Sequence, residues 1–360
     1  MNKQEKNLTL ELARFLAPNK DILSELLPSS ATPEVLGHLF FNRMAGCAYH
    51  SLKEKGLLGS LNREFRNSLK SAYDQNIIHN QSFFACIHLL NKILQGCQGK
   101  YAMLKGALLC DAYPTGCRTS NDIDLLVAPE DVSLIGDALT NAGFQQGHVR
   151  NGDFIPATRR EIVESKMTRG ETVPYILEVD LPFLRYLEVD INFSLDYKNS
   201  DATILRDMLA RSVRKNVQKT DICTLDQSDF FIHLCAHLYK EATTLPWIQM
   251  KRDMTLYKFC DIYLQLCCLF NKDMDNIFQR AAELDMADIC ACVILWTEAL
   301  LPSENTHAIK RAKACLTDKK ELLDLVIAPT EKKIYRYTEQ DVYKRFFAPD
   351  RSCLLEEVSQ

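Results

Sequence analysis

One short run of residues constrains the fold more than any other: Asp122-Ile123-Asp124-Leu125-Leu126-Val127. Side chains alternate between the two faces of a strand, so Asp122 and Asp124 would share one face, opposite an apolar face that needs a core. Two adjacent carboxylates repel each other unless a cation or open water relieves the repulsion, and their oxygen atoms suit Mg²⁺ or Mn²⁺. The run therefore predicts a strand with a divalent-metal site on its polar face, although a solvated strand end would also explain the Asp-x-Asp tripeptide taken alone.

The residues before this run supply positive charge and a flexible backbone. Residues 101–104, Tyr-Ala-Met-Leu, are typical of a short strand, and they lead into Lys105 and Gly106. Glycine at this position would let the backbone approach a phosphate closely, with N–H groups available to bind its oxygens. Lys105 and Arg118 would add positive charge. We therefore expect a nucleotide phosphate close to the two carboxylates.

Together these motifs resemble a known family. Residues 103–127, MLKGALLCDAYPTGCRTSNDIDLLV, are similar to the nucleotidyltransferase-like proteins of the polymerase-beta superfamily, whose pattern is a Gly-(Gly/Ser) turn, a spacer and Asp-apolar-Asp. They look most like an uncharacterised bacterial branch with the pattern LKG...R...DIDLLV. Ala107 stands where the wider superfamily has Ser or Gly. The similarity extends over roughly residues 80–265.

The resemblance implies a reaction and a set of site residues. The reaction is transfer of a nucleoside monophosphate from an NTP, with ATP expected, to an acceptor, with release of pyrophosphate. Three residues would be both catalytic and ligands of Mg²⁺ (or Mn²⁺): Asp122, Asp124 and Asp190. Four residues would bind the nucleotide: Lys105, Gly106, Arg118 and Ser120.

The third carboxylate has two candidates, because the string Leu-Glu-Val-Asp occurs at both 177–180 and 187–190. By strand alternation, Glu188, Asp190 and Asn192 would share the polar face of a second strand. Asp180 is the competing match, but Pro182 soon interrupts its strand. We therefore prefer Asp190, which is also the position that the resemblance implies. In the family branch, His often occupies the position of Asn192.

Helical patterns occupy both ends of the chain. Apolar residues recur at i+3 and i+4 over residues 83–94 and 225–241, and an acidic first turn predicts a helix over 129–143. For residues 101–143 we predict strand, turn, strand and helix, with further strands up to residue 195. Beyond Asp196 the chain is predicted to be helical again.

These elements predict an α+β fold, in which a small mixed β-sheet forms a nucleotidyltransferase core flanked by N-terminal and C-terminal helical regions. The expected divisions are an N-terminal helical region at 1–98, the catalytic core at 99–200 and a C-terminal helical domain at 201–360. A chain of 360 residues with 47% hydrophobic residues is long and apolar enough for such an arrangement.

Charge limits the class of acceptor. A net charge of −4 provides no general attraction to polyanions, so a nucleic acid would need a local basic track. Basic residues gather in only two modest groups: Arg159, Arg160, Lys166 and Arg169, and Arg211, Arg214, Lys215 and Lys219. We therefore expect a small-molecule or peptide acceptor and no nucleic-acid partner. A similarity to abortive-infection nucleotidyltransferases leaves open a toxin-like enzyme acting on tRNA or protein, and a non-catalytic nucleotide-binding module is a third hypothesis.

Other features argue against a membrane protein and against structural zinc. Because no apolar run is long enough to cross a bilayer and the first residues lack a signal-peptide pattern, we expect a cytoplasmic protein with no membrane partner. The 14 cysteines lack Cys-x-x-Cys pairs and are expected to be reduced thiols. His233 and His237 would share a helix face, but no Glu follows His233 as a zinc-binding His-Glu-x-x-His motif requires, so packing is expected.

Overall fold

The structure is a computed structural model that describes residues 1–168, 170–195 and 202–358. Two compact units divide the chain, one formed by Met1–Lys70 with Phe231–Gln360 and the other by Ser71–Phe230. We call them the helical unit and the sheet unit. The predicted divisions at residues 98 and 200 stay predictions about domains. The second of them, and the basic residue Arg169, lie outside the described residues.

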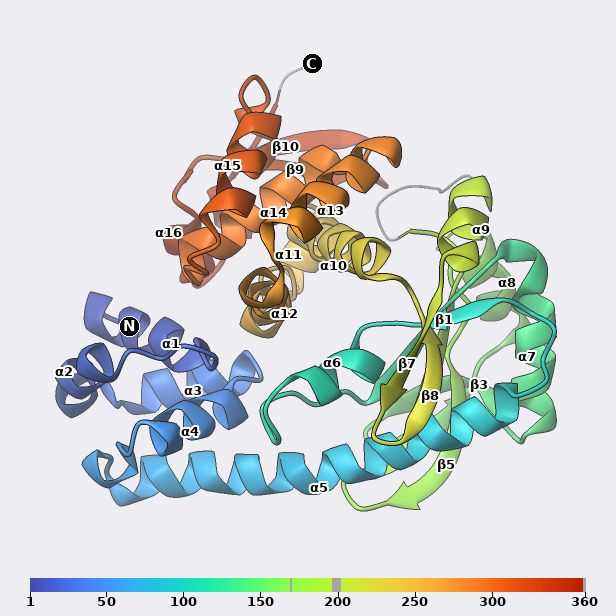
Figure 1. Ribbon diagram of the computed structural model, residues 1–360, viewed down its shortest axis with the longest axis horizontal. Coiled ribbons are helices and arrows are strands. Elements are labelled where there is room, and N and C mark those ends of the chain that lie inside the picture. The colour runs from blue at the N-terminus through green and yellow to red at the C-terminus, as the bar shows by residue number, and fades with distance from the viewer. Residues whose placement is uncertain (169, 196–201, 359–360) are drawn as a thin grey trace. The chain divides into compact units, whose positions relative to one another are not determined.

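The sheet unit is built on an eight-stranded mixed sheet with the strand order β4-β3-β5-β6-β2-β1-β8-β7 (Figure 1). The pairs β2–β6 and β1–β8 are parallel, and the other pairs are antiparallel. The strands are β1 (Tyr101–Met103), β2 (Asp122–Val127), β3 (Gln145–Arg150), β4 (Asp153–Pro156), β5 (Tyr175–Leu181), β6 (Leu184–Asn192), β7 (Val213–Val217) and β8 (Thr220–Thr224).

Helices connect and cover these strands. They are the part of α5 (Arg63–Leu94) that belongs to this unit, α6 (Gly106–Ala112), α7 (Val132–Asn141), α8 (Arg159–Thr168) and α9 (Ala202–Ala210), with a 3₁₀ turn at Pro129–Asp131. The C-terminal half of α5 runs along the sheet, where Ser82 Oγ donates to the carbonyl of Pro182 at 2.8 Å and His88 Nδ1 lies 3.2 Å from Thr220 Oγ1 (Figure 1). The expected α+β fold with helical flanks is confirmed.

The hydrophobic pattern explains why β2 lies in the middle of the sheet. Ile123, Leu125 and Val127 are fully buried, as the alternation predicts. Leu126 is buried too, because the helices α6 and α9 both contact β2. The next predicted helix is also present, and it ends before Gly143, whose φ of 95° favours glycine.

The secondary structure of the sheet unit differs from expectation in places. Residues 106–112, predicted as part of a turn, form α6, since an apolar run of seven residues is too short for its periodicity to distinguish helix from loop. Residues 213–224, predicted as helical, form the hairpin β7–β8. Its two turn residues, Gln218 and Lys219, have φ of 44° and 69°. Such turns favour Asn and Gly, so the usual sequence signal of a hairpin is missing.

The helical unit contains most of the remaining helices. They are α1 (Lys3–Ala13), α2 (Lys20–Ser30), α3 (Pro33–Phe41), α4 (Ala45–Glu54), α10 (Gln227–Ala242, from Phe231 onward), α11 (Leu245–Gln249), α12 (Leu256–Cys268), α13 (Asn271–Glu283), α14 (Ala287–Leu300), α15 (Thr306–Cys315) and α16 (Val342–Phe346). Its 3₁₀ turns are Leu58–Ser60, Lys320–Leu323 and Ser352–Leu354. The N-terminal and C-terminal segments pack together in this unit, as the 2.9 Å hydrogen bond from Leu256 N to Asn42 Oδ1 illustrates.

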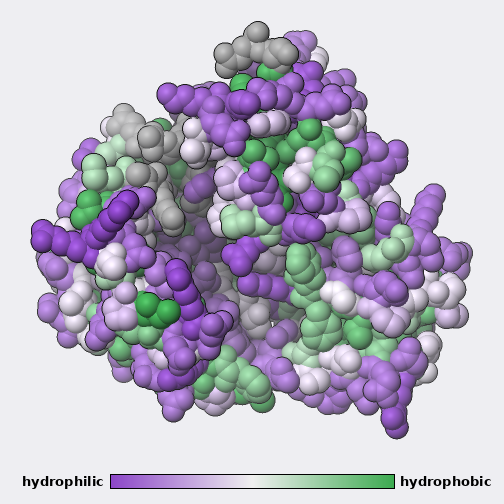
Figure 2. Space-filling view, turned by 180° about the vertical axis from the view of Figure 1, so that it is seen from behind, coloured by the Kyte–Doolittle hydropathy of each residue, from purple (hydrophilic) through white to green (hydrophobic). Residues whose placement is uncertain are grey.

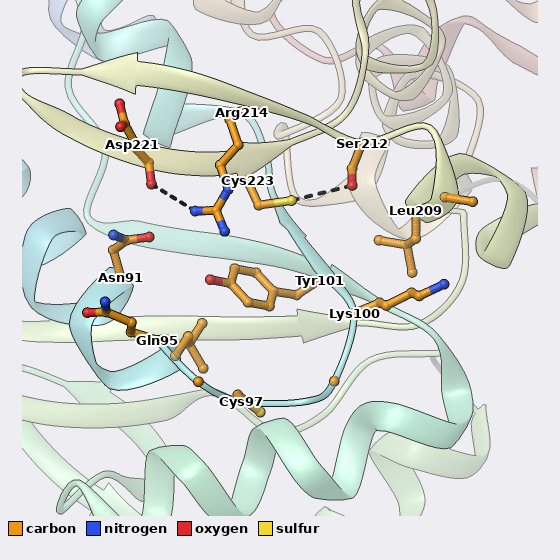
Figure 3. Close-up of a pocket in the computed structure, with 14 residues that line it drawn as sticks. Asn91, Gln95, Cys97, Lys100, Tyr101, Leu209, Ser212, Arg214, Asp221 and Cys223 are labelled. Atoms are coloured by element: carbon orange, nitrogen blue, oxygen red, sulfur yellow. Dashed lines mark hydrogen bonds between the residues drawn. The ribbon is translucent and has the colours of Figure 1, made fainter.

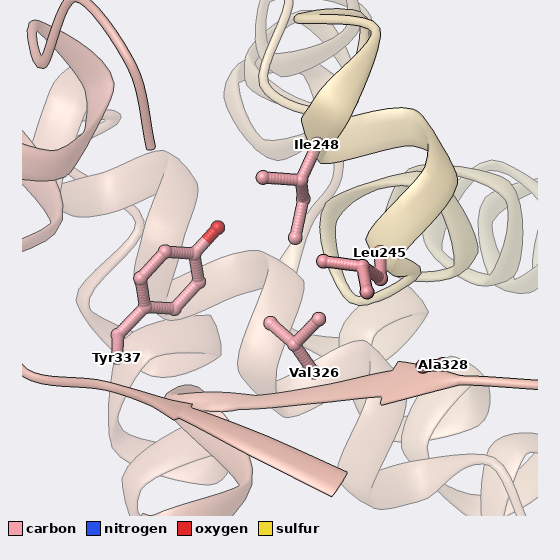
Figure 4. Close-up of a cluster of buried hydrophobic side chains, with 5 residues drawn as sticks. All are labelled: Leu245, Ile248, Val326, Ala328 and Tyr337. Carbon is pink, nitrogen blue, oxygen red and sulfur yellow. The ribbon is translucent and has the colours of Figure 1, made fainter. Parts of the chain in front are cut away.

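A three-stranded sheet in the order β11-β10-β9 completes the helical unit, although its sequence region was expected to be helical. The strands are β9 (Leu325–Ala328), β10 (Lys333–Tyr337) and β11 (Leu355–Glu357). Leu245 and Ile248 of α11 pack on Val326 and Tyr337, so a small apolar core joins helix and sheet (Figure 4).

The surface is polar for the most part. Figure 2 shows one face of the molecule, on which apolar side chains occur in small separated patches. The most exposed large apolar side chains among the described residues include Met167 and Phe270, which are 81% and 79% exposed. Within the described residues, no helix is both long enough and apolar enough to span a bilayer.

Candidate active site

The candidate site lies in the middle of the sheet unit, where β2 and β6 run parallel. In the register of this pair, Asp122 lies opposite Glu188 and Asp124 lies opposite Asp190. Residues opposite each other on parallel strands point to the same face, and the strands are about 4.8 Å apart. The sheet therefore brings four carboxylates together on one face. It places Asp190 beside Asp124, the arrangement expected from the sequence.

Asp180, the competing candidate, lies elsewhere. It is near the end of β5, where the pairing with β6 is irregular between Glu178 and Leu181. Its φ is 46°, in the left-handed region, and its side chain is exposed. The two Leu-Glu-Val-Asp strings thus have different environments, and only the second aligns an aspartate with β2.

Polar neighbours contact the two aspartates of β2. Lys105 Nζ lies 3.1 Å from Asp124 Oδ1, and the side chains are 16% and 11% exposed, so solvent screens this ion pair little. Asn192 Nδ2 donates to the same Asp124 oxygen at 3.4 Å. Ser120 Oγ donates to Asp122 Oδ1 at 2.8 Å. Lys105 and Ser120, both expected to bind nucleotide, contact the carboxylates directly in this structure.

The carboxylates perturb one another. Burial, followed by the negative charges of Asp124, Asp122 and Glu171, raises the pKa of Asp190 well above its usual value, and Lys105 offsets part of this effect. Burial and the charge of Asp122 also raise the pKa of Glu188. Negative charge therefore exceeds positive charge at this place on the sheet, which is the electrostatic condition that a cation would relieve.

The structure around the turn between β1 and α6 explains why Gly106 is a glycine. Lys105 has a φ of 40°, and α6 begins at the next residue. A Cβ on Gly106 would collide with the side chain of Ser120, which is itself buried. Gly106 therefore makes room for the hydroxyl group that contacts Asp122. Its contact with a phosphate stays a prediction.

The loop that leads into β2 is held by α5, a contribution that the sequence analysis missed. Asn76 Nδ2 donates to the Gly116 carbonyl and Asn80 Nδ2 to the Arg118 carbonyl, both at 2.9 Å. His79 Nε2 lies 3.0 Å from the Asn121 side chain. The spacing of three polar residues at i, i+3 and i+4 on an otherwise amphipathic helix was the available signal. These bonds fix the backbone around Arg118 and just before Asp122.

The donor set has the chemistry of a divalent-metal site but not yet its geometry. In the described parts of the chain, no three His, Cys, Asp or Glu side chains are already grouped so that they could hold a metal ion. Asp122 and Asp124 are instead engaged with Ser120 and Lys105. His233 and His237 are likewise in no such group of potential metal ligands among the described residues. His233 is buried, and His237 Nε2 lies 3.5 Å from Glu241 in the next turn of α10.

A cavity of about 470 Å³ opens beside Asp190. It lies between β3, α8 and the segment before β5, and most of its charged lining is acidic: His148, Arg150, Glu161, Glu164, Glu171 and Asp190. Thr172 also lines it. The Thr172 hydroxyl is buried and makes no hydrogen bond to any described residue, so it is available to a bound molecule.

The sequence of the chain matches a family described as uncharacterised nucleotidyltransferase over residues 29–302. The chain belongs to this family. Membership confirms the resemblance derived from residues 103–127 and extends it over most of the chain. Among the curated proteins, none matches the sequence.

One solved structure similar to this uncharacterised nucleotidyltransferase family member is the crystal structure of an antigenic nucleotidyltransferase-like protein from Paracoccidioides brasiliensis. The two share 13% sequence identity and align with a TM-score of 0.31, over 56% of this chain and 90% of the other. Similarity at this level supports no inference about residues or substrates. The site of this family member must be interpreted from its own geometry.

Proposed function

We propose that the protein is a metal-dependent nucleotidyltransferase, which moves a nucleoside monophosphate from an NTP to a small-molecule or peptide acceptor and releases pyrophosphate. The observation that carries the proposal is the register of β2 and β6. It aligns Asp124 with Asp190, and Asp122 is two residues before Asp124 on the same face of β2. Family membership supports the reaction class. ATP is the expected NTP.

Asp122, Asp124 and Asp190 would hold Mg²⁺ (or Mn²⁺). Their oxygen ligands suit these hard cations, and the raised pKa of Asp190 reflects unbalanced negative charge in the same place. A bound divalent cation would neutralise phosphate charge and stabilise the entering and leaving oxygens. Lys105 now neutralises part of the charge, as its ion pair with Asp124 shows.

The remaining residues would position the triphosphate. Lys105 and Arg118 supply positive charge, and Ser120 supplies a hydroxyl donor within the same loop region. The loop that carries Arg118 is anchored to α5 by Asn80, so it would lose little conformational entropy when the nucleotide binds. Gly106 would permit close approach of the backbone at the turn.

The reaction needs one proton acceptor. An acceptor oxygen or nitrogen would form a bond to the α-phosphorus, the bond from that phosphorus to the β,γ-phosphate oxygen would break, and pyrophosphate would leave. The proton of the acceptor would pass to Asp190, which lines the cavity of about 470 Å³. A carboxylate within reach of the bound acceptor is a suitable general base.

The same cavity would hold the acceptor. Its lining includes Glu161, Glu164 and Glu171 in addition to Asp190, with Arg150 and His148 as the basic groups. Such a surface favours hydroxyl or amine groups and repels a polyanion. This distribution supports a small molecule or peptide over tRNA or DNA as the acceptor.

The proposal can be tested by label transfer. Purified protein would be incubated with each α-labelled NTP, Mg²⁺ and pools of small alcohols, amines and peptides. We expect label in an acceptor and release of pyrophosphate, loss of both in Asp122→Asn, and retention of both in Asp180→Asn. Asp180 is the control because it lies in the other copy of the Leu-Glu-Val-Asp string that contains Asp190, outside the carboxylate cluster. Equal transfer by Asp122→Asn and the wild type would refute the site.

A non-catalytic nucleotide-binding module is the second candidate, favoured by the absence of a preassembled group of metal ligands among the described residues. NTP binding by calorimetry without transfer to any acceptor pool would support it. A toxin-like enzyme acting on tRNA would instead show sub-micromolar, salt-sensitive tRNA binding together with label at the 3′ end, and one acting on protein would label a polypeptide.

A further inference from the structure

A second cavity, of about 540 Å³, lies within the sheet unit away from the carboxylates (Figure 3). The end of α5, the first residue of β1, the end of α9 and the hairpin β7–β8 line it. Its volume is in the range of pockets that hold small molecules. The proposed reaction gives it no role.

The strand register separates this cavity from the candidate active site. Tyr101, which lines the cavity, pairs with Val127 at the far end of β2 from Asp122. Five residues of strand correspond to about 16 Å at 3.3 Å per residue. A small molecule in the second cavity would therefore not reach the carboxylates.

Hydrogen-bond donors dominate the polar lining. The Arg214 guanidinium points toward the Tyr101 ring from β7, and the amides of Asn91 and Gln95 lie to the left of that ring, at the end of α5 (Figure 3). Arg214 makes a long bond of 3.3 Å to the backbone carbonyl of Asp221, and its five N–H donors exceed what this single acceptor can use. Arginine binds carboxylate and phosphate oxygens in pairs, so it suits an anionic headgroup.

Negative charge is scarce in this cavity. Asp221 is the one carboxylate residue among its described lining residues, and its Oδ1 accepts a bond of 2.6 Å from Asn216. Burial raises the pKa of Tyr101, so its hydroxyl group stays protonated and remains a donor at neutral pH. The polar part of the cavity thus offers donors and little repulsion to an anion.

The apolar part offers a flat surface. The Tyr101 ring is partly buried, and Leu94 and Leu209, which line the same cavity, are almost completely buried. An aromatic ring between aliphatic side chains favours a planar or apolar ligand body, with the ring stacking contributing to affinity. Arg214 is exposed, whereas the leucines are buried. A ligand in this cavity would therefore place its anionic headgroup toward Arg214 and solvent, and its apolar body toward the ring.

We propose that this cavity is a separate binding site for a small organic anion, whose carboxylate or phosphate group contacts Arg214 and whose planar body lies on Tyr101. The arginine was one of the basic residues that the charge pattern singled out, and the proposed catalytic reaction leaves it unused. The site would serve a ligand other than the NTP and the acceptor.

Calorimetry with the full chain can test this assignment, with phenyl phosphate, benzoate, benzyl alcohol and benzylamine as probes. The four probes share an aromatic body and differ in charge. We expect at least one of the two anions, phenyl phosphate or benzoate, to bind with one molecule per chain. The anion that binds more tightly indicates whether the natural ligand carries a phosphate or a carboxylate. Benzyl alcohol should bind at least about tenfold more weakly, because it lacks the charge-assisted bonds. Binding of neither anion, or equal binding of benzylamine, would overturn the proposal.

Variants locate the binding. Arg214→Gln and Tyr101→Phe should each weaken anion binding, the first by about tenfold or more and the second by a few-fold. Lys215→Gln is the matched control, because Lys215 is the next residue on β7, is exposed and does not line the cavity. Asp124→Asn should leave the anion affinity unchanged. Unchanged affinity in Arg214→Gln, or loss in Asp124→Asn, would show that the anion binds elsewhere.

Discussion

One buried aspartate in each unit has a different charge environment: Asp253 in the helical unit and Asp124 in the sheet unit. In the helical unit, Asp253 is fully buried and both its oxygens accept bonds of 2.6 Å from Arg351, which is also buried. In the sheet unit, buried Asp124 lies 3.1 Å from Lys105 and beside Asp190 on the neighbouring strand. The first arrangement pairs opposite charges, whereas in the second burial and neighbouring carboxylates raise the pKa of Asp190. Paired buried charges are typical of structure, and unbalanced ones are typical of function.

The difference matters because like charges held together oppose folding. A fold would be more stable if the position of Asp190 carried a neutral side chain, since burial and three neighbouring carboxylates all disfavour its charged form. Selection for stability alone does not explain such a cluster. We therefore expect loss of Arg351 to destabilise the fold and loss of the aspartates of β2 and β6 to impair the proposed ligand binding, and each half of the comparison can be tested.

The largest effect is expected from Arg351→Met. This change leaves Asp253 buried without its partner, which typically reduces the free energy of unfolding by about 3–5 kcal/mol. Urea denaturation of the variant and the wild type measures it. Lys333→Met is the control, because the Lys333 pair with Glu357 is about half exposed and such pairs contribute roughly 0–1 kcal/mol. Equal losses of unfolding free energy in the two variants would show that the buried Asp253–Arg351 pair is no more important for stability than an exposed pair.

The next effect concerns activity. Asp124→Asn keeps the size of the side chain and removes its charge, so turnover should fall by at least about 10²-fold, or roughly 2.7 kcal/mol of barrier. The free energy of unfolding should fall by no more than about 1 kcal/mol, because the lost Lys105 pair is offset by reduced repulsion. Turnover by label transfer and stability by urea denaturation would be measured on the same preparation. A variant that loses several kcal/mol of unfolding free energy but retains its specific activity would reverse the assignment.

Much of this site was predictable from local sequence pattern. Alternation along a strand predicted the shared face of Asp122 and Asp124, and it distinguished Glu188, Asp190 and Asn192 from their apolar neighbours. The preference for Asp190 depended on Pro182 as well, and the structure places this proline just after the irregular end of β5. Period-two patterns and strand breakers act locally, so one sequence suffices to recognise them.

Other features depend on contacts between distant segments, which sequence periodicity does not encode. Asn80 bonds the Arg118 carbonyl across 38 residues, and no local pattern marks the two as neighbours. The hairpin β7–β8 was missed because its turn lacks glycine and asparagine, and its position beside β1 follows from the sheet as a whole. The second cavity likewise combines three stretches of the chain, at residues 91–101, 209–214 and 221–223. Tertiary packing decides such features, and local propensity does not.

A smaller effect of opposite sign is expected from Asp190→Asn. Without metal, removing this charge should raise the free energy of unfolding, because burial and the neighbouring carboxylates disfavour the charged form of Asp190. Stabilising single substitutions commonly contribute about 0.5–2 kcal/mol. Urea denaturation in the presence of a chelator measures it. Asp180→Asn is the control, and a change within about 0.5 kcal/mol is expected because Asp180 is exposed. A destabilised Asp190→Asn protein would mean that the cluster is structural after all.

The smallest effect tests whether the hydrogen bonds that hold the loop before β2 also contribute to nucleotide binding. Asn80→Ala removes the donor to the Arg118 carbonyl, and the loss of one buried hydrogen bond should reduce the free energy of unfolding by about 1 kcal/mol. If Arg118 contacts the nucleotide, the freed loop should also raise the KM for NTP a few-fold, while kcat changes less, because the carboxylates stay in place. Gln75→Ala on the same helix is the control, since its bond to Ser71 is exposed. If stability falls while the KM for NTP stays unchanged, Asn80 has a purely structural role. That result would also contradict a role for Arg118 in binding the nucleotide.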